Sequence, residues 1–162
     1  MLEFKNTGRA RVVNALDGRV IKCYYGSNAD KRFRNERRVL THLNDLECPF
    51  VPELLDSNAS RLSITLEHCG AGVEYLPDQS IQILFERLLP FGVRHNDPAV
   101  RNVLYDSRRS DFTLIDFELA EIINAPFPVS APLKLGIRQP DSWFPNGDVC
   151  YASESNVRSS SH

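Results

Sequence analysis

The sequence lacks the features that would assign it to a membrane, to a secreted disulfide framework or to a nucleic acid. No apolar run is long enough to span a bilayer, and the N-terminus has no secretory signal pattern. The formal net charge of -2 gives no electrostatic argument for binding to DNA, RNA or an anionic membrane. We therefore expect no nucleic-acid partner and no membrane partner.

Cysteine is also scarce, and its spacing gives no paired metal site. The four cysteines are widely separated: Cys23, Cys48, Cys69 and Cys150. Neither they nor the histidines have the spacing of a zinc motif. We interpret the cysteines as reduced thiols, which favours a cytoplasmic or nuclear location.

The composition that remains is ordinary for one compact unit. With 162 residues, of which 42% are hydrophobic and 25% charged, the chain can bury a core. We expect a single domain over residues 1–152. Residues 153–162 are polar and have no apolar period, which predicts a disordered tail.

The most informative part of the chain is a set of polar residues that begins at His95. Asp97 and Asn102 follow it closely, and Asp116 ends the next apolar run. Phosphoryl transfer requires a carboxylate near the attacking hydroxyl and oxygen ligands for Mg²⁺. Asp97 can accept or orient the hydroxyl proton, while Asn102 and Asp116 can supply hard oxygen ligands. The alternative is an unrelated hairpin that carries these residues by chance.

Two short apolar runs, residues 102–105 and 112–115, indicate a pair of strands joined by the polar turn 106–111. Asn102 begins one strand, and Asp116 follows the end of the other. Because those positions are neighbours in an antiparallel pair, we expect the two oxygen ligands to lie close together.

These residues form two signatures that resemble those of the protein kinase-like superfamily. One is His-x-Asp-x-x-x-x-Asn, formed by His95, Asp97 and Asn102, and the other is Asp-Phe-x, which begins at Asp116. The first is also similar to the Asp-x-Ala-x-Arg-Asn form of many tyrosine kinases, which implies that Arg101 faces the transferred phosphoryl group. The resemblance implies ATP and Mg²⁺ as cofactors, with Asp97 as the base and Asn102 and Asp116 as metal ligands.

The N-terminal part has the strands and the lysine that this resemblance requires. Asp17-Gly18 is a hairpin turn motif between residues 11–16 and 19–25, which have strand character. Lys22 follows two apolar residues, as the lysine of the kinase Val-Ala-Ile-Lys signature does. A lysine among apolar residues on a strand is costly unless an acid pairs with it.

Glu36 is the candidate partner of Lys22. Residues 27–30 resemble a capping box, and an apolar stripe then predicts a helix whose inner side includes Glu36. In kinases such an ion pair positions the lysine on the nucleotide phosphates. The alternative is an exposed strand lysine and a solvated helix glutamate. The surrounding basic residues are expected on the outer face of the helix: Lys31, Arg32, Arg34, Arg37 and Arg38.

Two further strands, at residues 51–57 and 61–67, would complete a small antiparallel sheet. After them the resemblance implies a hinge at residues 67–72, with backbone groups of Glu67 and Cys69 facing an adenine. A plain loop after an edge strand is the alternative for this segment. Cys69 is then either reactive or merely buried.

Three positions depart from the family pattern. Only Gly8 fits a glycine-rich loop, and the few residues before it indicate a first strand that is short or missing. Asn96 stands where the family has an arginine, so regulation through a phosphorylated activation segment is not expected. Glu118 stands where the family has a glycine, which restricts the backbone there, and its carboxylate can crowd or assist the metal site.

The second half of the sequence predicts little helix. Residues 78–89 carry a helical apolar stripe that we interpret as core, and Pro90 ends it. The proline-rich stretch 125–132 breaks any helix there. Trp143 is a candidate for docking the tail.

The expected fold class is α+β, with a kinase-like two-lobe fold. Its N-lobe covers residues 1–68 and contains a small antiparallel sheet with one helix, and its reduced helical C-lobe covers residues 73–152. The resemblance implies an ATP- and Mg-dependent phosphotransferase that acts on a hydroxyl of a protein or a small molecule. The catalytic and nucleotide-binding residues are expected to be Asp97, Arg101, Lys22, Glu36, Glu67, Cys69 and Gly8, and the metal ligands Asn102 and Asp116.

Two alternatives stay open. The weak glycine loop, Glu118 and the missing C-terminal half also fit a pseudokinase that binds a nucleotide or a partner without turnover. The chain can also be a fragment that needs a second polypeptide to fold.

Overall fold

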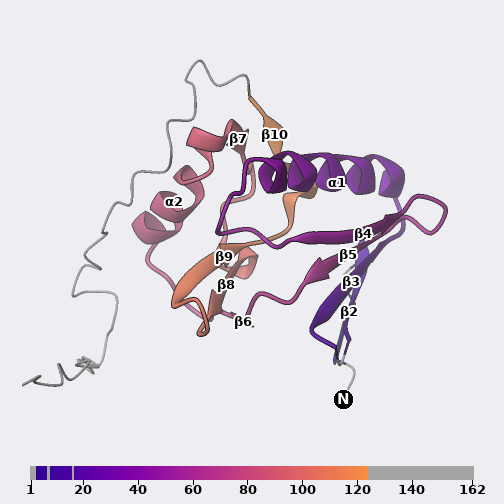
Figure 1. Ribbon diagram of the computed structural model, residues 1–162, viewed down its shortest axis with the longest axis horizontal. Helices are drawn as coiled ribbons and strands as arrows, with labels where there is room; N and C mark the ends of the chain where they lie inside the picture. The colour runs from indigo at the N-terminus through magenta and orange to yellow at the C-terminus, as the bar shows by residue number, and fades with distance from the viewer. Residues whose placement is uncertain (1–2, 7, 16, 124–162) are drawn as a thin grey trace, which may run out of the picture. The chain divides into compact units, whose positions relative to one another are not determined.

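The computed structural model describes residues 3–6, 8–15 and 17–123 (Figure 1). The chain divides into two units, Met1–Pro132 and Leu133–His162, and all described residues belong to the first.

The described residues have an α+β architecture with two α-helices and three antiparallel sheets, which confirms the predicted class. Neither helix in this part of the chain has the length and apolar character needed to cross a membrane. The predictions for residues 125–132, for Trp143 and for the tail at 153–162 lie outside the described residues. The predicted domain boundaries stay a prediction.

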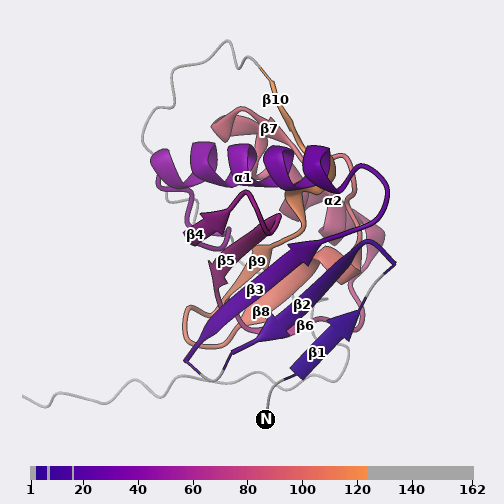
Figure 2. The same cartoon turned by 90° about the vertical axis from the view of Figure 1, so that its right-hand side faces the viewer.

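The largest sheet in the described part has five strands in the order β1-β2-β3-β5-β4 (Figure 2). They are β1 (Glu3–Asn6), β2 (Ala10–Asn14), β3 (Arg19–Tyr24), β4 (Leu54–Asn58) and β5 (Ser63–Glu67). Gly18 has a φ of 77°, which glycine adopts without strain, and this allows the predicted turn between β2 and β3. The first strand is short, as predicted, but it is present. The predicted strand at residues 51–57 begins only at Leu54.

Helix α1 (Ala29–Asp45) packs against β3, β4 and β5 (Figure 1). Its apolar stripe and Glu36 are buried, which confirms the predicted inner side. The predicted capping box is wrong, because the N-cap Asn28 has a left-handed backbone and its side chain makes no capping hydrogen bond. Asparagine tolerates that conformation, and its carbonyl oxygen accepts the first bond of the helix, from the backbone nitrogen of Arg32.

Arg32 is also a correction to the predicted outer face of α1. The other four basic residues of that face are exposed, but Arg32 is buried. Its guanidinium donates hydrogen bonds to the carbonyl oxygens of Arg9, Tyr25 and Ser27. These bonds replace the water that a buried cation loses, so burial is tolerated here.

The predicted hairpin is present in a three-stranded sheet of order β6-β8-β9. Its strands are β6 (Ala71–Gly72), β8 (Val103–Asp106) and β9 (Asp111–Leu114). The backbone nitrogen of Ile115 donates to the carbonyl oxygen of Asn102 at 3.0 Å. Asn102 and Asp116 therefore lie at the same end of the hairpin, as the sequence predicts. A third sheet pairs β7 (Val93–Arg94) with β10 (Glu121–Ile122).

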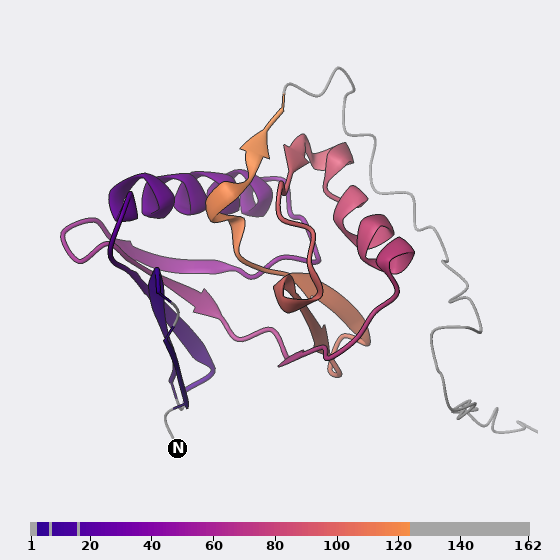
Figure 3. The ribbon, with the colours of Figure 1, turned by 180° about the vertical axis from the view of Figure 1, so that it is seen from behind.

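Helix α2 (Asp78–Glu86) is shorter than predicted (Figure 3). Pro90 lies in a separate 3₁₀ turn, η1 (Leu89–Phe91), because proline cannot donate the backbone hydrogen bond of a continuing helix. Leu84, Phe85 and Leu88 are buried, as expected for a core stripe. Leu89 is exposed, so the prediction that the whole stripe is core is wrong at its last residue.

Candidate active site

The candidate site is built around Lys22, which lies within β3. Its Nζ donates to Oε2 of Glu36 and to Oδ1 of Asp116, at 2.7 Å in each case. Oε2 of Glu118 is 3.9 Å from the same nitrogen. Asp116 and Glu118 come from the turn that contains the 3₁₀ helix η3 (Phe117–Leu119). The side chains of Lys22 and Glu36 are only 11% and 1% exposed, which excludes the alternative of two solvated side chains.

Glu36 connects three elements through one carboxylate. Its Oε2 also accepts a hydrogen bond from the hydroxyl of Tyr24, and its Oε1 accepts one from the backbone nitrogen of Phe117 at 3.2 Å. Tyr24 follows Lys22 by one full strand period, so both side chains lie on the same face of β3. Glu36 thereby joins β3, α1 and the η3 turn.

The surroundings of the cluster keep Lys22 charged. Burial alone would lower the pKa of Lys22, but the carboxylates of Glu36 and Asp116 outweigh it and raise that pKa above its ordinary value. Burial and the charge of Glu36 raise the pKa of Tyr24, so its hydroxyl keeps the proton that it donates. Lys22 is therefore a permanent cation, and Glu36 and Asp116 fix the position of its ammonium group.

Glu36, Asp116 and Glu118 present carboxylate oxygens within 4.8 Å of one another, a spacing at which acids can hold a metal ion. The ammonium group of Lys22 already lies among these oxygens and supplies the cation that they require. We therefore assign Glu36, Glu118 and Oδ1 of Asp116 to the lysine, so that Oδ2 of Asp116 is the oxygen of the triad that can reach a metal ion. Of the three acids, only Asp116 was predicted as a metal ligand. The side chain of Asp116 is 37% exposed and accessible from solvent.

The predicted base Asp97 lies before the 3₁₀ turn η2 (Val100–Asn102). The amide nitrogen of Asn102 donates to both the backbone oxygen and Oδ2 of Asp97, at 2.9 Å in each case. Nη2 of Arg101 donates to Oδ1 at 2.7 Å and to Oδ2 at 2.8 Å. Since the nitrogen of the Asn102 amide is used in this way, its Oδ1 is the atom that can coordinate a cation. Both bonds use Nη2 of Arg101, so Nε and Nη1 are not engaged by Asp97, and the side chain is 65% exposed.

His95 connects the Asp97 segment to the Asp116 segment. Its Nε2 lies 2.9 Å from the backbone oxygen of Ile115, and since a carbonyl only accepts, Nε2 carries the proton. Nδ1 is buried and has no hydrogen-bond partner among the described residues. Burial lowers the pKa of His95, because a second proton would find no acceptor. His95 therefore braces the loop as a neutral side chain.

The other predicted nucleotide-binding residues have separate contacts. The backbone nitrogen of Glu67 donates to the oxygen of Glu53 at 3.0 Å, and its carboxylate pairs with Arg109 at 2.9 Å. Cys69 is buried, and burial raises the pKa of its thiol to about 11, which argues against a reactive thiolate at neutral pH. Gly8 is exposed, and no described atom lies within 4 Å of where a Cβ would be. Nothing described around Gly8 therefore requires a glycine.

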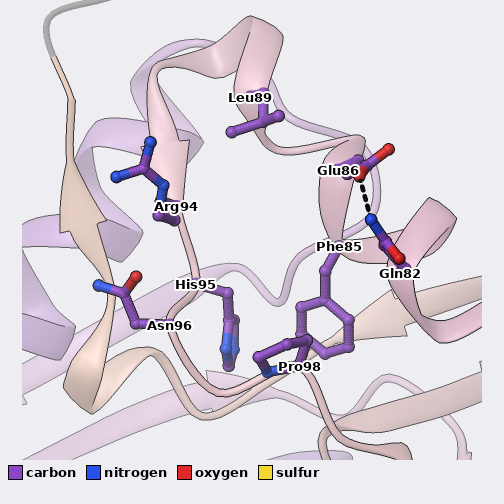
Figure 4. Close-up of a pocket in the computed structure, with 8 residues that line it drawn as sticks. All are labelled: Gln82, Phe85, Glu86, Leu89, Arg94, His95, Asn96 and Pro98. Atoms are coloured by element: carbon purple, nitrogen blue, oxygen red, sulfur yellow. Dashed lines mark hydrogen bonds between the residues drawn. The ribbon is translucent and has the colours of Figure 1, made fainter. Parts of the chain in front are cut away.

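A cavity of about 390 Å³ lies between α2 and the segment that follows β7 (Figure 4). Figure 4 shows the rings of Phe85, His95 and Pro98 close together on one side of this cavity. Its lining residues are Gln82, Phe85, Glu86, Leu89, Arg94, His95, Asn96 and Pro98. No member of the Lys22 cluster is among them. The charged cluster around Lys22 therefore lies outside this cavity.

Three neighbours of the cluster were not predicted: Tyr24, Arg32 and Asn35. The amide nitrogen of Asn35 donates to the backbone oxygens of Glu118 and Ala120. Tyr24 could have been found from the two-residue strand period. Arg32 could have been found because it precedes Glu36 by about one helical turn. No comparable pattern marks Asn35, because its partners are backbone oxygens from a distant segment.

Comparison with known proteins adds no family to this description. No model of a known protein family matches the chain, and no curated protein matches its sequence. The functional argument therefore rests on the residues and their contacts.

Proposed function

We propose that the chain is an ATP- and Mg-dependent phosphotransferase with a compact, kinase-like arrangement of its site. The acceptor is a hydroxyl group of a protein or a small molecule. The observation that carries this proposal is the placement of Lys22 between Glu36 and Asp116, at 2.7 Å from each. A lysine held in this way offers a directed positive charge, which is what the phosphates of a nucleotide require.

The two predicted signatures support the proposal because they share one end of the β8–β9 hairpin. Asn102 and Asp116 lie there next to each other through the Ile115–Asn102 backbone hydrogen bond. Their oxygens are hard ligands and suit Mg²⁺. When bound, Mg²⁺ would neutralise charge on the nucleotide phosphates.

The acceptor side of the proposed site is Asp97. Its carboxylate would accept or orient the proton of the attacking hydroxyl. Asn102 orients this residue through one hydrogen bond to the carboxylate and one to the backbone oxygen. Arg101 would leave Asp97 and turn toward the transferred phosphoryl group, where a mobile cation stabilises developing charge. Its side chain is 65% exposed, so it can move without displacing the core.

A second candidate function is binding of a nucleotide or a partner without transfer. Arg101 and Asn102 together occupy both carboxylate oxygens of Asp97, which favours an unreactive base. The exposed Gly8 segment likewise supplies no glycine-rich loop for the phosphates. A protein of this kind would keep the Lys22 cluster as a binding site alone.

Incubation with γ-labelled ATP and Mg²⁺ separates the two candidates. A phosphotransferase passes the label to itself, to an added hydroxyl acceptor or to water, and Asp97→Asn abolishes that transfer. Label that stays on ATP, in a protein that binds the nucleotide, would favour the binding function. Full transfer by Asp97→Asn would show that the base is assigned wrongly. Asp30→Asn, in an exposed ion pair on α1, is the matched control and should transfer normally.

A further inference from the structure

Glu118 places a third acid beside Lys22, and its charge is balanced by Arg32. Oε2 of Glu118 lies 3.3 Å from Nη1 of Arg32 and 3.9 Å from Nζ of Lys22. The side chains of Glu118 and Arg32 are both nearly buried. A buried ion pair of this kind is costly to separate, because each group would lose its nearest opposite charge at a place where water cannot replace it.

Arg32 also contacts the segments that flank β2 and β3. Its guanidinium donates to the backbone oxygens of Arg9 at 3.1 Å and of Tyr25 at 2.7 Å. It also donates to the backbone oxygen of Ser27, at 3.1 and 3.3 Å. The Arg32–Glu118 pair therefore ties the η3 turn to α1, to the start of β2 and to the loop between β3 and α1.

The backbone of the η3 turn is held by further contacts from outside it. Asn35 on α1 donates to the oxygens of Glu118 at 3.1 Å and of Ala120 at 2.8 Å, and Asn96 donates to the oxygen of Leu119 at 3.2 Å. Asp116 itself has a left-handed backbone, with φ 67° and ψ 65°, which is sparsely populated by residues other than glycine. Such a conformation persists only where surrounding contacts determine it.

We propose that Arg32 and Glu118 are a positioning pair, which holds the η3 turn against α1 so that Asp116 meets Lys22 before any ligand binds. The inference rests on the proposed function, since it concerns readiness of the same site for a nucleotide. Glu118 touches no reacting atom in this account. It acts through the position of Asp116 and through the charge that it offers to Arg32.

The test uses the full chain with Glu118→Gln, Arg32→Gln and the double variant. Hydrogen exchange is measured without nucleotide at two amides of the turn. The amide of Phe117 donates to Glu36, and that of Ala120 donates to the backbone oxygen of Phe117. Affinity for the fluorescent trinitrophenyl derivative of ATP with Mg²⁺ is measured well below the melting temperature. Arg34→Gln, which breaks the exposed Arg34–Asp30 pair on the same helix, is the control.

We expect each single variant to accelerate exchange at these two amides by about tenfold or more, as for loss of a charged hydrogen bond. Exchange in the β8–β9 hairpin should not change. Nucleotide affinity should fall by a similar factor, and the double variant should lose no more than the worse single variant, because both act through one contact. Arg34→Gln should change neither readout.

Unchanged exchange at both amides in Glu118→Gln would overturn the positioning pair, and so would a lower melting temperature with unchanged exchange and affinity. If Glu118→Gln does not fold, Glu118→Asp keeps the charge and shortens the reach to Arg32, and the same two readouts decide. Failure of the unmodified protein to bind the probe would refute the proposed function. The exchange result would then still decide the pair by itself.

Discussion

The Lys22 cluster joins residues that lie 14 and 94 positions apart. In the part of the chain that the structure describes, the side-chain hydrogen bonds of Asp97 reach only Arg101 and Asn102, four and five positions away. The side chains of Lys22, Glu36 and Glu118 are nearly buried between β3, α1 and the η3 turn, whereas that of Asp116 is 37% exposed. In the Asp97–Arg101 pair both side chains reach solvent, with 30% and 65% accessible.

This difference separates two kinds of contribution to a site. Ion pairs between distant segments form only after the chain has folded, and their charged groups lose water when they form. Ion pairs within one short segment form locally, and water screens the attraction between their charges. Substitutions in the cluster should therefore affect stability strongly, while substitutions around Asp97 should affect mainly chemistry.

The largest effect is expected for Glu36→Ala. It leaves Lys22 with one fewer acid, and removes the acceptor for Tyr24 and for the backbone nitrogen of Phe117. Breaking a buried pair in this way should lower the free energy of unfolding by about 3–5 kcal/mol. Urea denaturation measures it, with Asp30→Ala as the exposed control. If Glu36→Ala lowers the free energy of unfolding no more than the control does, the Lys22 cluster does not differ from the Asp97 loop in its contribution to stability.

Asn102→Ala should have the next largest effect, although it belongs to the local region. Asn102 is buried and its amide makes both hydrogen bonds to Asp97, so its removal leaves a half-buried backbone oxygen without its donor. Denaturation should show a loss of about 1–3 kcal/mol. Proposed phosphoryl transfer should also fall, because Asp97 loses its orientation. A stability unchanged by Asn102→Ala would contradict this account of the loop.

A pH dependence should follow from His95, which connects the two regions. Burial holds its pKa below the ordinary value of 6.5, so the unfolded chain binds more protons as the pH falls below 6.5. The stability that His95 contributes is therefore complete above that pH, and it is lost as the pH falls from there toward the folded pKa. Denaturation at pH 7.5 and pH 5.5 measures this loss. His95→Gln, which keeps a donor for the oxygen of Ile115, should reduce it, and an equal loss in both proteins would contradict the assignment.

The smallest change in stability is expected for Arg101→Gln. The pair with Asp97 is exposed and lies within one loop, so its removal should cost about 0–1 kcal/mol. Proposed phosphoryl transfer should fall much more than stability does, because Arg101 is assigned to the transferred group. A loss of stability as large as that of Glu36→Ala, or full transfer activity, would count against a role of this kind.

The sequence predicts the local features of this comparison well, because each depends on a short period or turn. The β2–β3 turn, the β8–β9 hairpin and the inward side of Glu36 all follow from residues within one or two elements. The Lys22–Glu36 pair follows from two such patterns, since a strand lysine and an inward helix acid both need a partner.

Other features were not predictable in this way because they depend on how distant segments meet. The contact of Asp116 with Lys22 requires closure over most of the chain. The helical spacing can place Arg32 on the side of Glu36, but no side-chain pattern marks the backbone oxygens of Arg9 and Tyr25 that accept its hydrogen bonds. The exposure of Leu89 similarly follows from the short α2 and not from its apolar stripe.

The most direct test of the Lys22 cluster as a nucleotide site is the melting temperature of the full chain with and without Mg-ATP, for the unmodified protein and for Asp116→Ala. A ligand that binds only the folded state must raise the melting temperature. The account predicts a rise that requires Mg²⁺ and that is lost in Asp116→Ala. A cooperative melt that Mg-ATP does not shift, or an equal shift in Asp116→Ala, would contradict it.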